Sequence, residues 1–159
     1  MYCLSLFTIC GLLVLTGCGK DDAEETKEQT DQQKAAQALK DGSPWQVTTV
    51  HSKPEGSDEE GVLSLKVSFG ISGSGLDIAP GSFDSEGAVD RLSSESNAKW
   101  AWSGTGLTSI TITDGFTSEL TNIQLLPNAE NPTAVKLTFA LSGESGRTTG
   151  NGEYTVTLE

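Results

Sequence analysis

The sequence offers few side chains that could act as nucleophiles, general bases or metal ligands. His51 is the single histidine, so a histidine-based metal cluster or a serine–histidine–aspartate triad would depend on this one residue. No G-x-S-x-G nucleophile elbow accompanies it. The three cysteines lie at positions 3, 10 and 18. None of these thiols lies beyond residue 18, so Cys18 is the last cysteine that could take part in covalent chemistry.

Cys18 follows an uncharged, mostly apolar segment from Tyr2 to Leu15. About 14 residues are too few to span a bilayer, which takes about 20, and they fit the apolar part of a signal peptide. Leu15-Thr16-Gly17-Cys18 resembles the lipobox of bacterial lipoproteins. The resemblance implies cleavage between Gly17 and Cys18, a thioether from the Cys18 sulfur to diacylglycerol, and a further acyl chain on its amine. No lysine or arginine precedes the apolar run, which departs from the usual export signal.

A charged sequence follows the cysteine at once. Lys20, Asp21 and Asp22 resemble the surface-export signal of Bacteroidota lipoproteins. The resemblance implies an outer-membrane protein, anchored to the membrane by its lipid and displayed on the cell surface. The alternative is an ordinary charged tether, with the protein on the periplasmic face.

The net negative charge of the chain bears on which partners it can bind. The net charge is −12, and the first charged residue is Lys20. An acidic surface repels phosphate backbones, so we expect no nucleic-acid partner. Acids are concentrated in residues 21–28 and 58–60. We interpret both groups as solvated charge, because residues 58–60 lack the spacing of a calcium loop. Apart from the lipid on Cys18, we expect no cofactor and no metal.

Three segments follow from these patterns. Residues 1–17 are the expected signal peptide, residues 18–43 a lipidated acidic tether that is partly helical, and residues 44–159 an antiparallel β domain. Within the tether, residues 23–40 are good helix formers without a wide apolar stripe. We therefore expect a solvated helix or spacer, a stalk of about 27 Å if fully helical.

From Trp45 onward, large apolar residues alternate with small polar ones, as in strands with one buried face. Turn residues separate the runs. We predict seven strands, with an eighth near Leu76 to Ile78. The predicted fold is all-β, an antiparallel lipocalin-like barrel or a two-sheet sandwich of about 7–8 strands. The seven runs are Trp45–Val47, Leu63–Ile71, Trp100–Trp102, Ile110–Ile112, Ile123–Leu125, Val135–Leu141 and Tyr154–Leu158.

Two features could contact a ligand. Residues 72–97 are mostly glycine, serine and acid, and so long a loop would be unusual unless it is functional. Trp100 and Trp102 share one strand face, and tryptophans stack on sugar rings or line apolar pockets. The competing interpretation places both tryptophans in the core.

Residues 39–159 resemble small β-domain lipoproteins of Bacteroidota. The matching motifs are Leu39 with Trp45, W-x-x-S-G-T at 100–105, I-x-x-x-D-G at 110–115 and G-x-Y-x-x-x-L at 152–158. Gly42-Ser43-Pro44-Trp45 also resembles the G-x-W start of lipocalin-like barrels, with one extra residue. These motifs are structural and imply no enzyme activity. We expect a non-catalytic domain that binds a ligand such as a glycan or lipid. The alternative is an accessory lipoprotein that docks on an outer-membrane protein complex without a small ligand.

The lipidation hypothesis predicts the result of one substitution. Replacing Cys18 by alanine removes the only thiol that the lipobox motif presents for acylation. Cells fed a labelled fatty acid should label the native protein and not Cys18→Ala. Continued labelling of the variant would refute lipidation at this residue.

Overall fold

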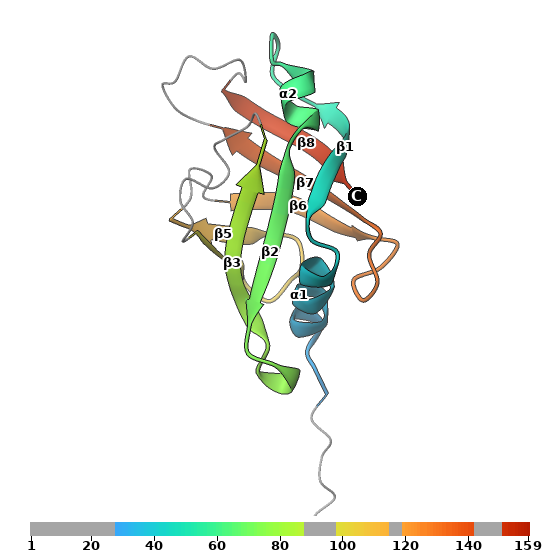
Figure 1. The fold of residues 1–159 in the computed structure, drawn as a ribbon, viewed down its shortest axis with the longest axis vertical. Helices are drawn as coiled ribbons and strands as arrows, with labels where there is room; N and C mark the ends of the chain where they lie inside the picture. Colours follow the sequence, from blue (N-terminus) through green and yellow to red (C-terminus); the bar gives the residue numbers. More distant parts are fainter. Residues whose placement is uncertain (1–27, 88–97, 115–118, 142–150) are drawn as a thin grey trace, which may run out of the picture.

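A computed structural model describes residues 28–87, 98–114, 119–141 and 151–159. It is a closed barrel of eight antiparallel strands, each paired with its neighbours in the sequence, and the last strand pairs with the first (Figure 1). The all-β prediction is therefore confirmed, and of the two architectures the barrel is the one observed. The strands are β1 (Trp45–Ser52), β2 (Lys66–Ser72), β3 (Ala79–Glu86), β4 (Lys99–Trp102), β5 (Ile110–Thr113), β6 (Glu119–Leu126), β7 (Ala134–Leu141) and β8 (Gly152–Leu158).

Two α-helices and one 3₁₀ turn complete the described chain: α1 (Asp31–Asp41), α2 (Glu59–Leu63) and η1 (Gly75–Asp77). The predicted run from Leu63 is wrong at its start, because Leu63 ends α2 and β2 begins at Lys66. Asp58 caps α2 by accepting a hydrogen bond from the Glu60 amide at 3.1 Å. Negative charge in a first helical turn is favourable, so part of the acidic run starts a helix.

The eighth strand lies a few residues beyond its predicted place. Leu76 and Asp77 belong to η1, and the strand is β3. The expectation of an unstructured loop over residues 72–97 is therefore wrong for its first half. β3 was hard to predict because Phe83 is its single large apolar residue. Phe83 is held in register by pairing with Phe69 of β2.

The barrel interior is filled by side chains from all eight strands. The apolar residues that the strands contribute to the core retain at most 4% of their surface exposed. Aromatic rings make edge-to-face contacts, with centroids 5.5 Å apart for Phe69 and Phe83 and 5.3 Å apart for Phe69 and Trp100. An eight-stranded barrel is just wide enough for its own side chains or one small ligand, and here side chains occupy the space.

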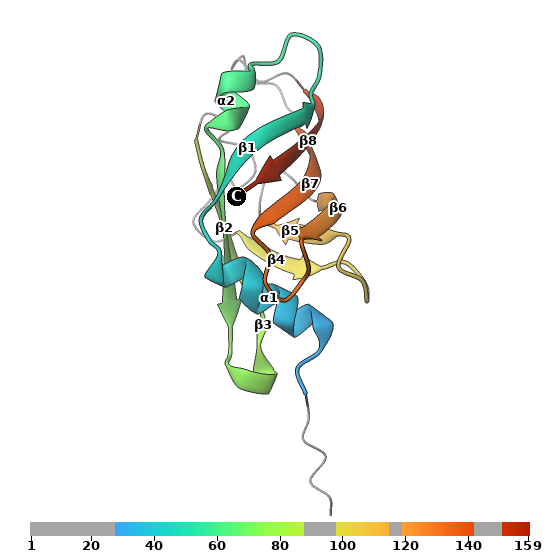
Figure 2. The same cartoon turned by 90° about the vertical axis from the view of Figure 1, so that its right-hand side faces the viewer.

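Helix α1 lies against the barrel and is part of the folded domain (Figures 1 and 2). It buries Ala35, Ala36 and Leu39. Its start is fixed by a capping box, in which the Thr30 hydroxyl and the Gln33 side chain each accept a backbone N–H of the other residue. The helix in the predicted tether is confirmed, but the expectation of a solvated stalk is wrong for residues 31–41. Small residues let α1 approach the barrel closely and leave only a narrow apolar stripe in the sequence.

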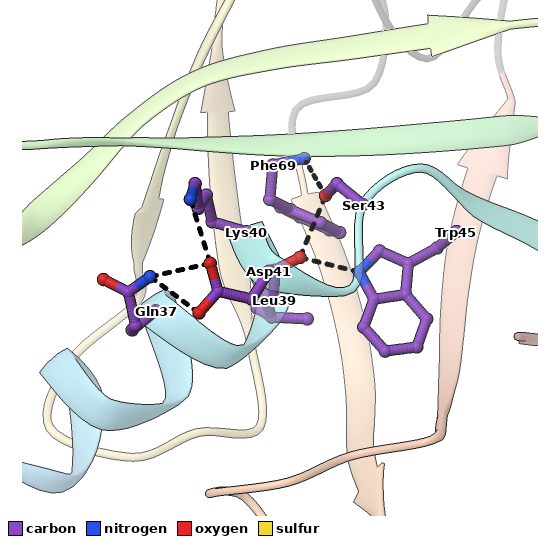
Figure 3. A network of polar contacts seen from close by, with 7 residues as sticks. All are labelled: Gln37, Leu39, Lys40, Asp41, Ser43, Trp45 and Phe69. Atoms are coloured by element: carbon purple, nitrogen blue, oxygen red, sulfur yellow. Dashed lines mark hydrogen bonds and ion pairs between the residues drawn. The ribbon is translucent and has the colours of Figure 1, made fainter.

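The joint between α1 and β1 is a compact polar network (Figure 3). The Leu39 carbonyl accepts the Trp45 indole N–H at 2.7 Å and the Ser43 hydroxyl at 2.9 Å. The same hydroxyl oxygen accepts the Phe69 amide of β2 at 2.9 Å. A Cβ atom on Gly42 would lie 2.1 Å from the Trp45 ring, so only glycine fits there. The Leu39 carbonyl thus connects the helix to β1, and the Ser43 hydroxyl connects this joint to β2.

Part of β2 extends past the start of β1, and α1 covers this part. The β1–β2 ladder contains the pairs Trp45–Val67 and Gln46–Lys66. Beyond Val67, β2 continues past the first residue of β1. There Ser43 and α1 lie beside the strand, and the Phe69 amide finds its acceptor in Ser43. The helix therefore covers a strand edge that β1 is too short to pair.

If α1 belongs to the core, shortening its one large buried side chain should destabilise the whole barrel. Leu39→Ala should lower the free energy of unfolding by about 2–4 kcal/mol, because it leaves a cavity between helix and barrel. Urea unfolding followed by far-UV circular dichroism measures this. The control is Lys40→Ala on the exposed side of the same helix, which should change stability by less than about 0.5 kcal/mol. Equal effects of the two substitutions would contradict the packing of α1.

Candidate functional site

The described surface has a groove on the outside of the barrel, where β2, β3 and β4 meet the end of β5. Its volume is about 550 Å³, within the range of small-ligand sites. It contains both polar and apolar groups. The lining residues are Ile71, Ser72, Pro80, Gly81, Ser82, Ala98, Lys99 and Asp114.

Glycines in two adjacent strands explain how closely the chain packs here. A Cβ atom on Gly70 would lie 2.2 Å from the Ser82 hydroxyl oxygen, and one on Gly81 would lie 3.0 Å from the Ile71 carbonyl carbon. The β2–β3 register shifts between Phe69 and Ile71, so Gly70 sits at an irregularity of the ladder. Glycine within a strand often marks such a bulge or the close approach of another group.

The β3–β4 ladder is short, which opens the barrel wall on this side. Between residues that the structure describes, it contains the pair Ser82–Lys99 and a hydrogen bond of 2.8 Å from the Phe83 amide to the Ala98 carbonyl. From inside, the Trp100 indole N–H donates to the Gly70 carbonyl at 2.7 Å. This bond joins β4 to β2 across β3. The groove is thus an external hollow over a closed interior.

The groove combines hydroxyl, apolar and charged groups. Ser72 and Ser82 supply hydroxyls, and Ile71 and Pro80 supply apolar surface. Lys99 is exposed and forms no ion pair with any other residue in the described ranges. Asp114 places a carboxylate at the end of β5, with a φ of 61° that suits the predicted Asp114-Gly115 turn. The lining includes no histidine or thiol that could activate a nucleophile.

The structure places Trp100 in the core and Trp102 against it, and neither residue lines this groove. Trp100 is 2% exposed. Its ring contacts Trp102 edge to face at a centroid distance of 5.5 Å. Trp102 is half-buried and donates its indole N–H to the Gln32 carbonyl of α1 at 3.2 Å. These contacts favour the core interpretation of both residues over direct ligand contact.

His51 and the acidic run lie away from the groove. His51 is exposed near the end of β1, with Nε2 2.8 Å from the Thr157 hydroxyl oxygen. Glu59 lies 3.5 Å from the Lys53 ammonium. Over the residues that the structure describes, no group of three His, Cys, Asp or Glu side chains is arranged to hold a metal ion. Helix capping and a surface ion pair account for Asp58 and Glu59.

A second hollow, of about 460 Å³, separates α1 from the β6–β7 turn. Its charges pair with each other. A hydrogen bond to Glu130, 3.1 Å from Nζ, raises the pKa of Lys34, and the Glu130 charge adds to this effect. Hydrogen bonds from Lys40, and then from Gln37, lower the pKa of Asp41 (Figure 3). Because these groups already satisfy one another, this hollow is less suited to an outside ligand than the groove.

Several predicted site residues fall outside the described ranges. These are Gly17 and Cys18 at the expected cleavage site and Lys20, Asp21 and Asp22 of the export signal. Among the residues that are described, no helix has the length and hydropathy needed to cross a membrane. Comparisons of the chain with protein-family models, with curated proteins and with solved structures find no match.

Sequence reasoning found part of the groove and missed the rest. Ser72, Pro80, Gly81 and Ser82 lie within the stretch 72–97 that was singled out as a binding surface. Lys99 and Asp114 were missed as groove residues. The useful signal would have been the two glycines, Gly70 and Gly81, within segments of strand length.

Burial of the tryptophans predicts the fluorescence of the protein. Trp45 and Trp100 are 3% and 2% exposed, and Trp102 is half-buried. The fluorescence emission of the native protein should therefore be blue-shifted. Acrylamide should quench it far less than it quenches the emission of the chain unfolded in urea. Trp102→Phe removes the most accessible indole and should reduce native quenching further. Native quenching as strong as in the unfolded chain would contradict these positions.

Proposed function

We propose that this chain is a lipoprotein anchored in the outer membrane and displayed on the cell surface, and that its barrel binds a glycan in the external groove. The observation that carries the binding proposal is a groove of about 550 Å³ with mixed polar and apolar lining on an otherwise filled barrel. No catalytic step is proposed.

The filled interior argues against a lipid ligand inside the barrel. A lumen wide enough for an acyl chain would leave accessible surface on the residues around it. The apolar side chains that form the core within the described strands are at most 4% exposed, and partly buried ones such as Trp102 pack against them. A ligand therefore has to bind outside the strands or displace core side chains, and displacement would cost several kcal/mol for each large residue removed from its contacts.

The groove offers the groups that a sugar needs. Hydroxyls of Ser72 and Ser82 can exchange hydrogen bonds with sugar hydroxyls, and Pro80 and Ile71 can pack against the apolar face of a ring. The Lys99 ammonium is without an ion-pair partner in the described ranges. Lys99 is the one cationic side chain among the lining residues, and its ammonium can donate a charge-assisted hydrogen bond to a sugar that bears a carboxylate.

The anchor proposal is supported by the sequence at Leu15 to Cys18 and by the Lys20-Asp21-Asp22 signal. Each buried methylene contributes about 0.8 kcal/mol, so two or three acyl chains hold a protein on a bilayer stably. Surface display is tested by treating intact cells with protease. The barrel should be lost from surface-displayed protein, whereas full protection would place it on the periplasmic face.

The glycan proposal is tested with a lysine substitution and a matched control. A glycan array identifies binders, and polygalacturonate serves as the acidic probe in titration calorimetry. Lys99→Ala should weaken binding about 10-fold or more, as expected for the loss of one charge-assisted hydrogen bond. Lys66→Ala removes an exposed lysine on β2 outside the groove and should leave affinity unchanged, which separates a local contact from net charge.

Three outcomes would contradict the proposal. Equal effects of Lys99→Ala and Lys66→Ala would place binding elsewhere. Binding of phospholipid instead of glycan would favour a lipid ligand. If no glycan on the array binds, and the same partner protein is crosslinked in repeated experiments in cells, an accessory role on an outer-membrane complex would be favoured.

A further inference from the structure

We propose that one end of the barrel faces the bilayer and that Leu76 contacts the lipid interface there. This end, called the α1 end, consists of residues 29–33, 75–78 and 103–109. The partner is a lipid surface. The inference rests on the proposed lipidation of Cys18 and adds an orientation to it.

The chain from Cys18 reaches the barrel at the α1 end. The Gln29 side chain donates to the Gly75 carbonyl at 2.7 Å. The Gln33 side chain donates to the carbonyls of Leu76 and Ile78. Across the helix, the Gln32 side chain donates to the carbonyls of Gly104 and Gly106 at 2.8 and 3.1 Å. Three glutamines thus fix the start of α1 and the residue before its cap to the β2–β3 and β4–β5 turns.

The two ends of the barrel lie at different distances from this attachment. In both views the β2–β3 turn lies at the same end as the start of α1, and α2 lies at the opposite end (Figures 1 and 2). β2 and β3 have 7 and 8 residues, or about 23–26 Å of strand at about 3.3 Å per residue. The α2 end is therefore farther from the point where the chain enters, by about the length of these strands.

The length of chain before the barrel limits which end can touch the membrane. Ten peptide steps separate Cys18 from Glu28, which span at most about 36 Å when fully extended. To bring the α2 end to the bilayer, the barrel has to turn over, and the chain between Cys18 and Glu28 has to extend over most of its limit of about 36 Å. The α1 end reaches the bilayer without such extension, so far more conformations of the chain allow it.

Leu76 gives this end an apolar contact point. It is 45% exposed, one of two large hydrophobic side chains so exposed among the described residues. It lies in η1, beside Gly75 and Asp77. The exposed acids Asp77, Asp31 and Glu28 lie at the same end. They keep the contact at the level of the headgroups and disfavour anionic lipids.

The orientation is tested with two single-cysteine variants, Leu76→Cys and Glu55→Cys. Glu55 is exposed in the turn before α2. In the lipidated protein Cys18 is acylated, so each variant carries one free thiol for an environment-sensitive fluorophore. The proteins are incorporated into phosphatidylcholine vesicles that contain a lipid with a quencher near the headgroup. The Leu76 label should be quenched several times more strongly than the Glu55 label.

Controls separate this inference from the anchor proposal. Vesicle flotation and mass spectrometry report whether the protein is lipidated and bound. If it floats and both labels are quenched equally, or Glu55 more strongly, the orientation is wrong and the anchor stands. If it is neither acylated nor bound, the proposed function fails first. Leu76→Cys combined with Cys18→Ser should show no quenching, because one leucine does not hold the barrel on a membrane. Both labelled positions are exposed, so neither change removes a core contact.

Discussion

The carbonyl of Leu39 is the point on which the architecture depends. It accepts hydrogen bonds from the Trp45 indole and the Ser43 hydroxyl at the end of α1, where its helical partner would be missing. Ser43 in turn accepts the Phe69 amide. A buried carbonyl or indole N–H without a partner is costly, so the three groups hold one geometry. That geometry sets the direction in which the chain leaves the helix and enters the first strand.

The same constraint connects the interior to the outer wall. Phe69, whose amide is held by Ser43, packs its ring against Phe83 and Trp100. Trp100 donates its indole N–H to Gly70, beside the irregularity where the groove forms. A continuous set of contacts therefore runs from α1 through the core to the groove. A filled core of this kind supports a site on the outside of the barrel, because inward-facing residues hold the strand backbones in place.

The strands were predictable where large apolar residues alternate, as in β7 and β8, because burial of one face leaves a period of two. α1 was misjudged as solvated because its buried face consists of two alanines and one leucine, which give almost no periodic signal. α2 was missed because Leu63 is in phase with the following strand. β3 was displaced because Pro80, Gly81 and Ser82 are poor strand formers, and only pairing with β2 holds them extended. The groove depends on Gly70 and Gly81 meeting across two strands, which a linear sequence does not reveal.

The covering of β2 by α1 has a consequence for association between barrels. A fragment that began at Trp45 would leave the β2 backbone from Phe69 onward without its helical shield, and the free amide of Phe69 would point into water. Open sheet edges recruit strands from other molecules. The short helix therefore covers a strand edge through which two barrels could pair, in addition to the core contacts that it makes.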